Sequence, residues 1–205
     1  MELQDLVEIE QIKRLKYRYL RCLDQKNWDD LEQCFTEDAT ASYGGGAYPF
    51  EGRERIMAFL REAMGADTFH SSHQCHHPEI DITGDGTATG VWALQDVVID
   101  TGYDLTISGA AFYTDRYRQV DGEWRIEHTG YKRLYEEVLP RGDVTGVRLT
   151  ASWWATDGRS ELAGRRVRRG SPAKLTRPRS PARRRPPGAP RPRSAWPRRR
   201  CARPG

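Results

Sequence analysis

The spacing of the apolar residues changes once along this chain, from a helical period to a strand period near residue 66. Before that point, apolar side chains recur every three or four positions at Leu6, Ile9, Ile12, Leu15, Tyr19 and Leu23. This spacing places them on one face of a helix of about five turns. A shorter version of the pattern begins after Asn27, a candidate N-cap, and a third version covers residues 51–64. We therefore predict three helices before residue 66.

Residues 40–52 contain three consecutive glycines and a proline, which favour a strand end or a loop. After residue 66, apolar and polar side chains alternate in four segments, which are residues 70–82, 87–100, 105–120 and 123–137. No helix-length connection separates these segments, so helices followed by consecutive strands indicate an α+β fold. We predict one mainly antiparallel sheet that curls around the first helix and buries its apolar face.

Net charge divides the chain at about residue 140. Residues 1–140 carry a net charge of −12, whereas residues 141–205 carry +16 and contain nine of the twelve prolines and 18 arginines. Such a segment buries too little apolar surface to offset its ordering entropy, so we predict a domain over 1–140 and a disordered tail over 141–205. The tail could contact nucleic acid, be a solvated extension or be a frameshifted terminus. Its single lysine favours a frameshift, and we do not expect nucleic acid as a partner.

The remaining composition excludes several protein classes. The sequence has no apolar run of about 18 residues that could span a membrane, and its first residues do not resemble a signal peptide. Its four cysteines are scattered without CxxC spacing, which argues against a disulfide framework and a structural zinc site. We therefore expect a cytoplasmic protein with no membrane partner.

Four of the five histidines, His70, His73, His76 and His77, fall within eight residues. On a regular strand, His73 and His77 share one face and His70 and His76 the other, so at most two could converge on a metal ion. The ligand spacings of zinc sites are also absent. The pattern favours mostly exposed histidines, with one buried histidine acting as a general base.

A histidine can act as a general base near neutral pH when a carboxylate orients it. The candidate carboxylates are Asp24, at the end of the first helix, and Asp96, within the apolar run WALQDVVI. A mid-strand carboxylate is costly to bury unless it is paired, so Asp96 faces either solvent or a functional cavity. Tyr19 fits a core position as well as a functional one, and Arg133 could be a solvated charge.

Five stretches occur in order between residues 9 and 138: IKRLKYRYLRCLDQKNWDDLE, HQCHHPEIDI, TATGVWALQD, GAAFYTDRY and DGEWRIEHTGYKRLYEE. Together they resemble the SnoaL-like branch of the nuclear transport factor 2 superfamily, and within it the bile acid 7-alpha dehydratases. The resemblance implies a cone-shaped fold in which helices pack on a strongly curved sheet around an apolar pocket. It also implies a catalytic set made of Tyr19, Asp24, His73, Asp96 and Arg133.

The activity implied by the resemblance is that of a cofactor-independent hydro-lyase, with no metal. Its substrate would be a steroid-like or other apolar polycyclic hydroxy-ketone, free or as a coenzyme A thioester. His73 would remove a carbon-bound proton, Asp24 would orient its ring, and Tyr19 would donate a hydrogen bond to the carbonyl. Asp96 would protonate the leaving hydroxyl, and Arg133 would hold an acidic group or a carboxylate. The sequence leaves the roles of Asp24 and Asp96 interchangeable.

Two other classes remain open on the sequence. An isomerase or a polyketide cyclase would use the same pocket without loss of water, and a non-catalytic binding or assembly module would share the fold. The resemblance also implies a homo-oligomer, with a trimer favoured over a dimer. We expect Trp28, Tyr43, Trp92 and Phe112 to shape the pocket.

Overall fold

The structure, a computed structural model, describes residues 2–84 and 86–162. These residues form three α-helices and two short 3-10 helices: α1 (Leu3–Asp24), α2 (Trp28–Glu32), η1 (Gly44–Gly46), α3 (Arg53–Met64) and η2 (Arg141–Asp143). The same part of the chain forms six strands: β1 (Phe35–Tyr43), β2 (Tyr48–Glu51), β3 (Phe69–Gly84), β4 (Thr87–Asp100), β5 (Leu105–Val120) and β6 (Glu123–Pro140). The predicted helices and the four predicted strands are confirmed.

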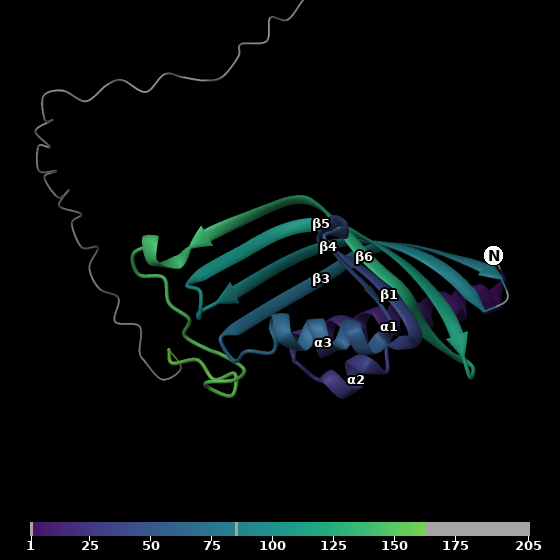
Figure 1. Cartoon of the computed structure of the whole chain (residues 1–205), viewed down its shortest axis with the longest axis horizontal. Coiled ribbons are helices and arrows are strands. Elements are labelled where there is room, and N and C mark those ends of the chain that lie inside the picture. Colours follow the sequence, from purple (N-terminus) through teal and green to yellow (C-terminus); the bar gives the residue numbers. More distant parts are fainter. Residues whose placement is uncertain (1, 85, 163–205) are drawn as a thin grey trace, which may run out of the picture. The chain divides into compact units, whose positions relative to one another are not determined.

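The strands form one sheet in the order β2-β1-β6-β5-β4-β3, in which only the β1–β6 pair is parallel. The sheet curves over α1 and α3, which lie on its inner side (Figure 1). The register places His73 of β3 directly opposite Asp96 of β4. Farther along the sheet, Ala111 of β5 lies opposite Arg133 of β6. The mainly antiparallel α+β fold is therefore confirmed, and it brings chemically active residues onto neighbouring strands.

The segment before α3 contains more structure than the sequence predicts. Residues 35–43 form β1, which joins the sheet beside β6, and η1 connects β1 to β2. The predicted strand end at residues 40–43 is the end of β1, but the start of β1 and the strand β2 were not predicted. Two buried positions of β1 hold alanine, at Ala39 and Ala41. Alanine contributes little to a hydrophobic period, so the alternation was hard to detect.

One face of α1 fills the space beneath the sheet, as its apolar period predicts. Ile12, Leu15, Tyr19 and Leu23 are buried, whereas Leu6 is half exposed, so the buried face begins about two turns later than predicted. None of the described helices is long and apolar enough to cross a membrane.

Residues 141–162 continue the chain beyond the predicted domain boundary and contact the domain. The backbone N–H of Arg141 donates to the carbonyl oxygen of Asp104 over 2.8 Å. Its Nη1 donates to Thr106 Oγ1 over 3.0 Å. Farther on, the ring of Trp154 lies under Lys26 Nζ, 4.3 Å from the ring centre. The boundary at residue 140 stays a prediction, and the tail beyond residue 162 lies outside the described residues.

Candidate active site

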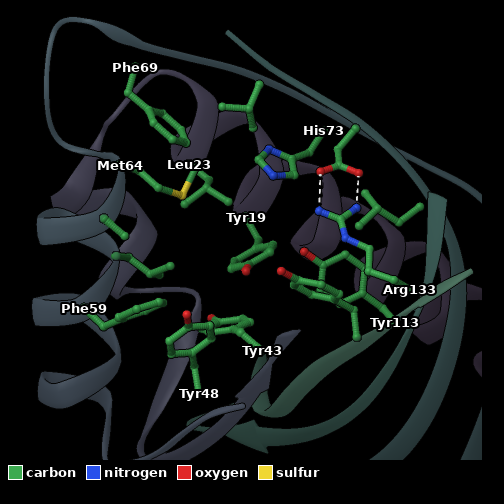
Figure 2. A pocket seen from close by; sticks show the side chains of 16 residues that line it. Tyr19, Leu23, Tyr43, Tyr48, Phe59, Met64, Phe69, His73, Tyr113 and Arg133 are labelled. Atoms are coloured by element: carbon green, nitrogen blue, oxygen red, sulfur yellow. Dashed lines mark hydrogen bonds and ion pairs between the residues drawn. The ribbon is translucent and has the colours of Figure 1, made fainter. Parts of the chain in front are cut away.

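A cavity of about 200 Å³ lies between α1, α3 and the inner face of the sheet. Seven of its 16 lining residues are Phe or Tyr, namely Tyr19, Tyr43, Tyr48, Phe59, Phe69, Tyr113 and Tyr131. Polar groups line a different part of the wall, where Figure 2 shows His73 near the ion pair of Arg133 with Asp96. A largely apolar cavity with a few convergent polar groups is the usual form of a small-molecule site.

The ring of His73 is fixed by the carboxylate that ends α1. His73 Nδ1 lies 2.6 Å from Asp24 Oδ1, and the backbone N–H of His73 donates to Asp24 Oδ2 over 2.9 Å. Ser71 Oγ also donates to Asp24 Oδ1, over 2.8 Å. This arrangement selects the tautomer with hydrogen on Nδ1 and leaves Nε2 for a bound substrate. Asp24 stands behind His73 and does not line the cavity, a position that suits an orienting group.

Asp96 faces the cavity, not the solvent, and is almost fully buried. Arg133 Nη2 donates to Asp96 Oδ2 over 2.9 Å, and Arg133 Nη1 donates to Asp96 Oδ1. Burial lowers the pKa of Arg133, but the hydrogen bonds and charge of Asp96 outweigh this effect and hold the pKa above its usual value. The guanidinium therefore keeps its proton, and both oxygens of Asp96 accept its hydrogen bonds.

Three tyrosines of the wall, Tyr19, Tyr43 and Tyr113, remain protonated at neutral pH. Burial is the largest cause that raises the pKa values of Tyr19, Tyr43 and Tyr113. The ring of Tyr19 packs edge-on against Phe35, with 5.7 Å between ring centres. Tyr19 is thus a core residue whose protonated hydroxyl can donate a hydrogen bond at the cavity wall. The sequence allowed both a core position and a functional one, and the structure fits both.

The structure brings the predicted site residues into one place. Tyr19, His73, Asp96 and Arg133 line the same cavity, and Asp24 contacts His73 from behind. The roles of these residues in a reaction stay predictions at this point.

The histidine cluster is divided by a strand irregularity. A register shift lies between His76 and Glu79, and His77 has a φ of +48°. His77 is therefore exposed, and the prediction that it shares a face with His73 was wrong. Within the described residues, no three His, Cys, Asp or Glu side chains gather as metal ligands.

Several wall residues differ from those that the sequence predicted. Tyr43 lines the cavity, but Trp28, Trp92 and Phe112 do not. Trp92 is buried away from the cavity, where its Nε1 donates to the hydroxyl of Tyr117 over 2.9 Å. Strand parity gives the reason for Phe112, which projects outward between the inward-facing Ala111 and Tyr113. Sequence analysis did not predict five aromatic residues of the wall, which are Tyr48, Phe59, Phe69, Tyr113 and Tyr131. The inward–outward alternation of side chains along β5 could have identified Tyr113.

The chain belongs to the SnoaL-like domain family, whose model matches residues 4–130, more than half of the sequence. An uncharacterized protein of Mycobacterium tuberculosis H37Rv is 27% identical over 143 residues, which cover 67% of this chain and 91% of that protein. The narrower resemblance to bile acid 7-alpha dehydratases stays a prediction.

Solved structures show the same fold. A putative scytalone dehydratase from Novosphingobium aromaticivorans has a TM-score of 0.60 at 22% identity, over 77% of this chain and 97% of that one. A LinA-type3 hexachlorocyclohexane dehydrochlorinase from Novosphingobium barchaimii has a TM-score of 0.62 at 17% identity, over 73% of this chain and 98% of that one. At these identities the likeness establishes the architecture alone.

Proposed function

We propose that this protein is a cofactor-independent hydro-lyase that removes water from an apolar polycyclic hydroxy-ketone, such as a steroid, free or as a coenzyme A thioester. The observation that carries the proposal is His73, held by Asp24 and exposed to a cavity with aromatic walls. The names of two structural neighbours, a dehydratase and a dehydrochlorinase, both denote eliminations and support this reaction class.

The reaction begins when Nε2 of His73 removes a proton from a carbon next to the conjugated carbonyl system of the substrate. The electron pair of that C–H bond moves into the conjugated system, and negative charge develops on the carbonyl oxygen. Tyr19 donates a hydrogen bond to this oxygen, which stabilises the charge. The Asp24 carboxylate stabilises the imidazolium that forms on His73.

The second step breaks the C–O bond of the hydroxyl group. The electron pair returns from the enolate and forms the new carbon–carbon double bond, while the proton gained by His73 passes to the departing oxygen, which leaves as water. Asp96, opposite His73 in the sheet, can relay this proton once it has received it. Arg133 then compensates for the charge that Asp96 carries before and after the relay.

An isomerase is the second candidate, and the Asp96–Arg133 pair favours it. Both carboxylate oxygens of Asp96 accept hydrogen bonds from Arg133, so this carboxylate is not preset to protonate a leaving group. A histidine base and a tyrosine donor are sufficient for enolisation without loss of water. The two reactions differ in whether a hydroxyl group leaves.

The test is turnover of a 7-alpha-hydroxy-3-oxo-4-ene steroid, free and as its coenzyme A thioester, followed by the ultraviolet absorbance of the extended dienone. We expect a new long-wavelength band from the wild-type protein and its loss in His73→Ala. His76→Ala, an exposed position on the same strand, is the matched control and should retain activity. Absence of the band from folded wild-type protein would contradict the proposed reaction on this substrate class.

A further inference from the structure

A fully buried ion pair lies outside the set of residues used so far. Lys16 of α1 and Asp115 of β5 both have no solvent exposure, and Lys16 Nζ lies 2.8 Å from Asp115 Oδ2. The hydroxyl of Tyr117 donates to Asp115 Oδ2 over 2.7 Å, and Thr129 Oγ1 donates to Asp115 Oδ1 over 2.8 Å. Three donors from α1, β5 and β6 therefore fix this carboxylate.

The ammonium group of Lys16 contacts two aromatic rings of the cavity wall. Its Nζ lies 3.5 Å from the ring centre of Tyr113 and 4.9 Å from that of Tyr19. Both distances are within the range of cation–π attraction, which is stronger in a desolvated place such as this one. Because both tyrosines line the cavity and Lys16 does not, the ion pair supports the wall from behind.

The pair also joins the two parts of the candidate site. Tyr19 and Asp24 belong to α1, whereas the other site residues belong to the sheet. Lys16 lies about one helical turn before Tyr19, and Asp115 lies two residues after Tyr113 on the same face of β5. A shift of α1 along the sheet would therefore stretch this bond and misalign Asp24 with the sheet residues.

Stability alone does not account for such a pair. The cost of removing two charges from water often exceeds their attraction, and well-packed apolar residues of similar volume are frequently as stable or more stable. The pair is thus better explained by the geometry that it imposes on its neighbours. Those neighbours are the two tyrosines that face the cavity.

We propose that the Lys16–Asp115 pair is a positioning element that holds Tyr19 and Tyr113 in place, and that Tyr113 is a second hydrogen-bond donor to the substrate oxygen. This inference rests on the proposed function. No hydrogen bond within the described residues uses the Tyr113 hydroxyl, and Figure 2 shows Tyr113 beside Tyr19 on the cavity wall. Tyr113 is therefore able to bind the oxygen on which charge develops.

The test uses a double variant that carries both Lys16→Met and Asp115→Leu and so lacks both charges. It is compared with the wild-type protein. We expect kcat to fall about tenfold or more while KM changes little, and the melting temperature to fall because the hydroxyls of Tyr117 and Thr129 lose their acceptor. Tyr113→Phe should lower kcat in the same way. Arg116→Met, beside Asp115 but on the outer face, is the matched control and should leave both kinetic constants unchanged. A stable double variant with the kcat of the wild type would overturn the proposal.

A second measurement does not depend on turnover. Nuclear magnetic resonance of ring-labelled tyrosines reports the flip rates of Tyr19 and Tyr113, which the ammonium group should keep slow. We expect faster flips in the double variant and unchanged flips in Arg116→Met; unchanged flips in the double variant would contradict the positioning role. If the double variant fails to fold, Thr129→Val, which removes one donor to Asp115, takes its place. We expect it to speed the flips less than loss of the pair would, because the ion pair is retained, and unchanged flips would contradict the positioning role. Slow wild-type flips without turnover would contradict the proposed reaction while retaining the positioning role.

Discussion

At the scale of single residues, the orientation of His73 depends on one carboxylate that accepts three hydrogen bonds. Asp24→Asn keeps the shape of this side chain but removes its charge and offers an amide in place of one acceptor oxygen. We expect kcat to fall about 10²-fold or more, because the wrong tautomer of His73 is then favoured. Ser71→Ala removes only one of the donors and should cause a smaller loss. Equal kcat values for Asp24→Asn and the wild type, measured with the dienone assay, would show that Asp24 does not orient the base.

His128 makes stability depend on pH. Its Nδ1 lies 2.7 Å from Thr40 Oγ1, and burial, together with the charge of Arg116, lowers its pKa below the usual value. The unfolded chain therefore binds a proton at a higher pH than the folded chain does, so stability is complete above about pH 6.5 and is lost as the pH falls below it.

We expect His128→Gln to flatten this loss of stability on the acid side. The measurement is the melting temperature between about pH 5 and pH 8, a range that contains the histidine pKa of unfolded chains. The exposed His76→Gln serves as the control. An acid slope that is unchanged by His128→Gln would mean that another group causes it.

Gly109 leaves room for the side chain of Arg133. A Cβ atom at this position would lie 2.7 Å from the carbonyl oxygen of Tyr135 and 3.0 Å from Arg133 Nη1. We expect Gly109→Ala to lower the free energy of unfolding by about 1–3 kcal/mol, because overpacking forces its neighbours to move. Ser108→Ala, at the preceding position, should change it little. Denaturant unfolding of both variants measures the difference, and equal stabilities would show that the strand absorbs the extra methyl group.

At the scale of elements, the chain after β6 contributes to the stability of the domain. Truncation after residue 140 removes the hydrogen bonds of Arg141 and the contact of Trp154 with Lys26. We expect this truncation to cost about 1 kcal/mol or more relative to truncation after residue 162. Equal melting temperatures of the two truncated proteins would support the domain boundary predicted at residue 140.

The elements that the sequence predicted well are those whose periodicity is strong. The apolar face of α1 and the alternation in β4 could be followed because large side chains mark them. β1 was not predicted as a whole strand because two of its central buried positions hold alanine, Ala39 and Ala41, which contribute little to a hydrophobic period. The burial of Lys16 was not predicted for a different reason. A charged residue beside an apolar helix face is normally taken to mark the edge of that face. Its burial is explained by the partner Asp115, 99 positions away, together with the ring of Tyr113.

The site itself was predictable in its residue types but not in its pairing. The sequence left Asp96 open between solvent and a functional cavity, and the family resemblance alone singled out His73 among the four clustered histidines. The sequence could not show that Arg133 pairs with Asp96, because that contact depends on the arrangement of three strands. The same limit applies to Asp24, whose distance from His73 depends on where α1 ends against the sheet.

At the scale of the whole molecule, a homotrimer stays a prediction. Val91, Val97 and Phe112 give the outer face of β4 and β5 partly exposed apolar side chains that association could cover. We expect sedimentation of the wild-type protein to show an oligomer, and Phe112→Asp to shift it toward the monomer. Thr89→Asp, farther along the same face, is the control for added charge. A wild-type monomer at all concentrations would contradict this prediction.

The central claim is that His73 removes a proton from carbon without help from a cofactor. The most direct measurement is the single-turnover rate with a steroid deuterated at the carbon that loses the proton, in buffer with a chelator and no added cofactor. We expect deuteration to lower this rate severalfold in the wild type, and His73→Ala to lower it about 10²- to 10⁴-fold. A rate that depends neither on deuteration nor on His73 would contradict the claim.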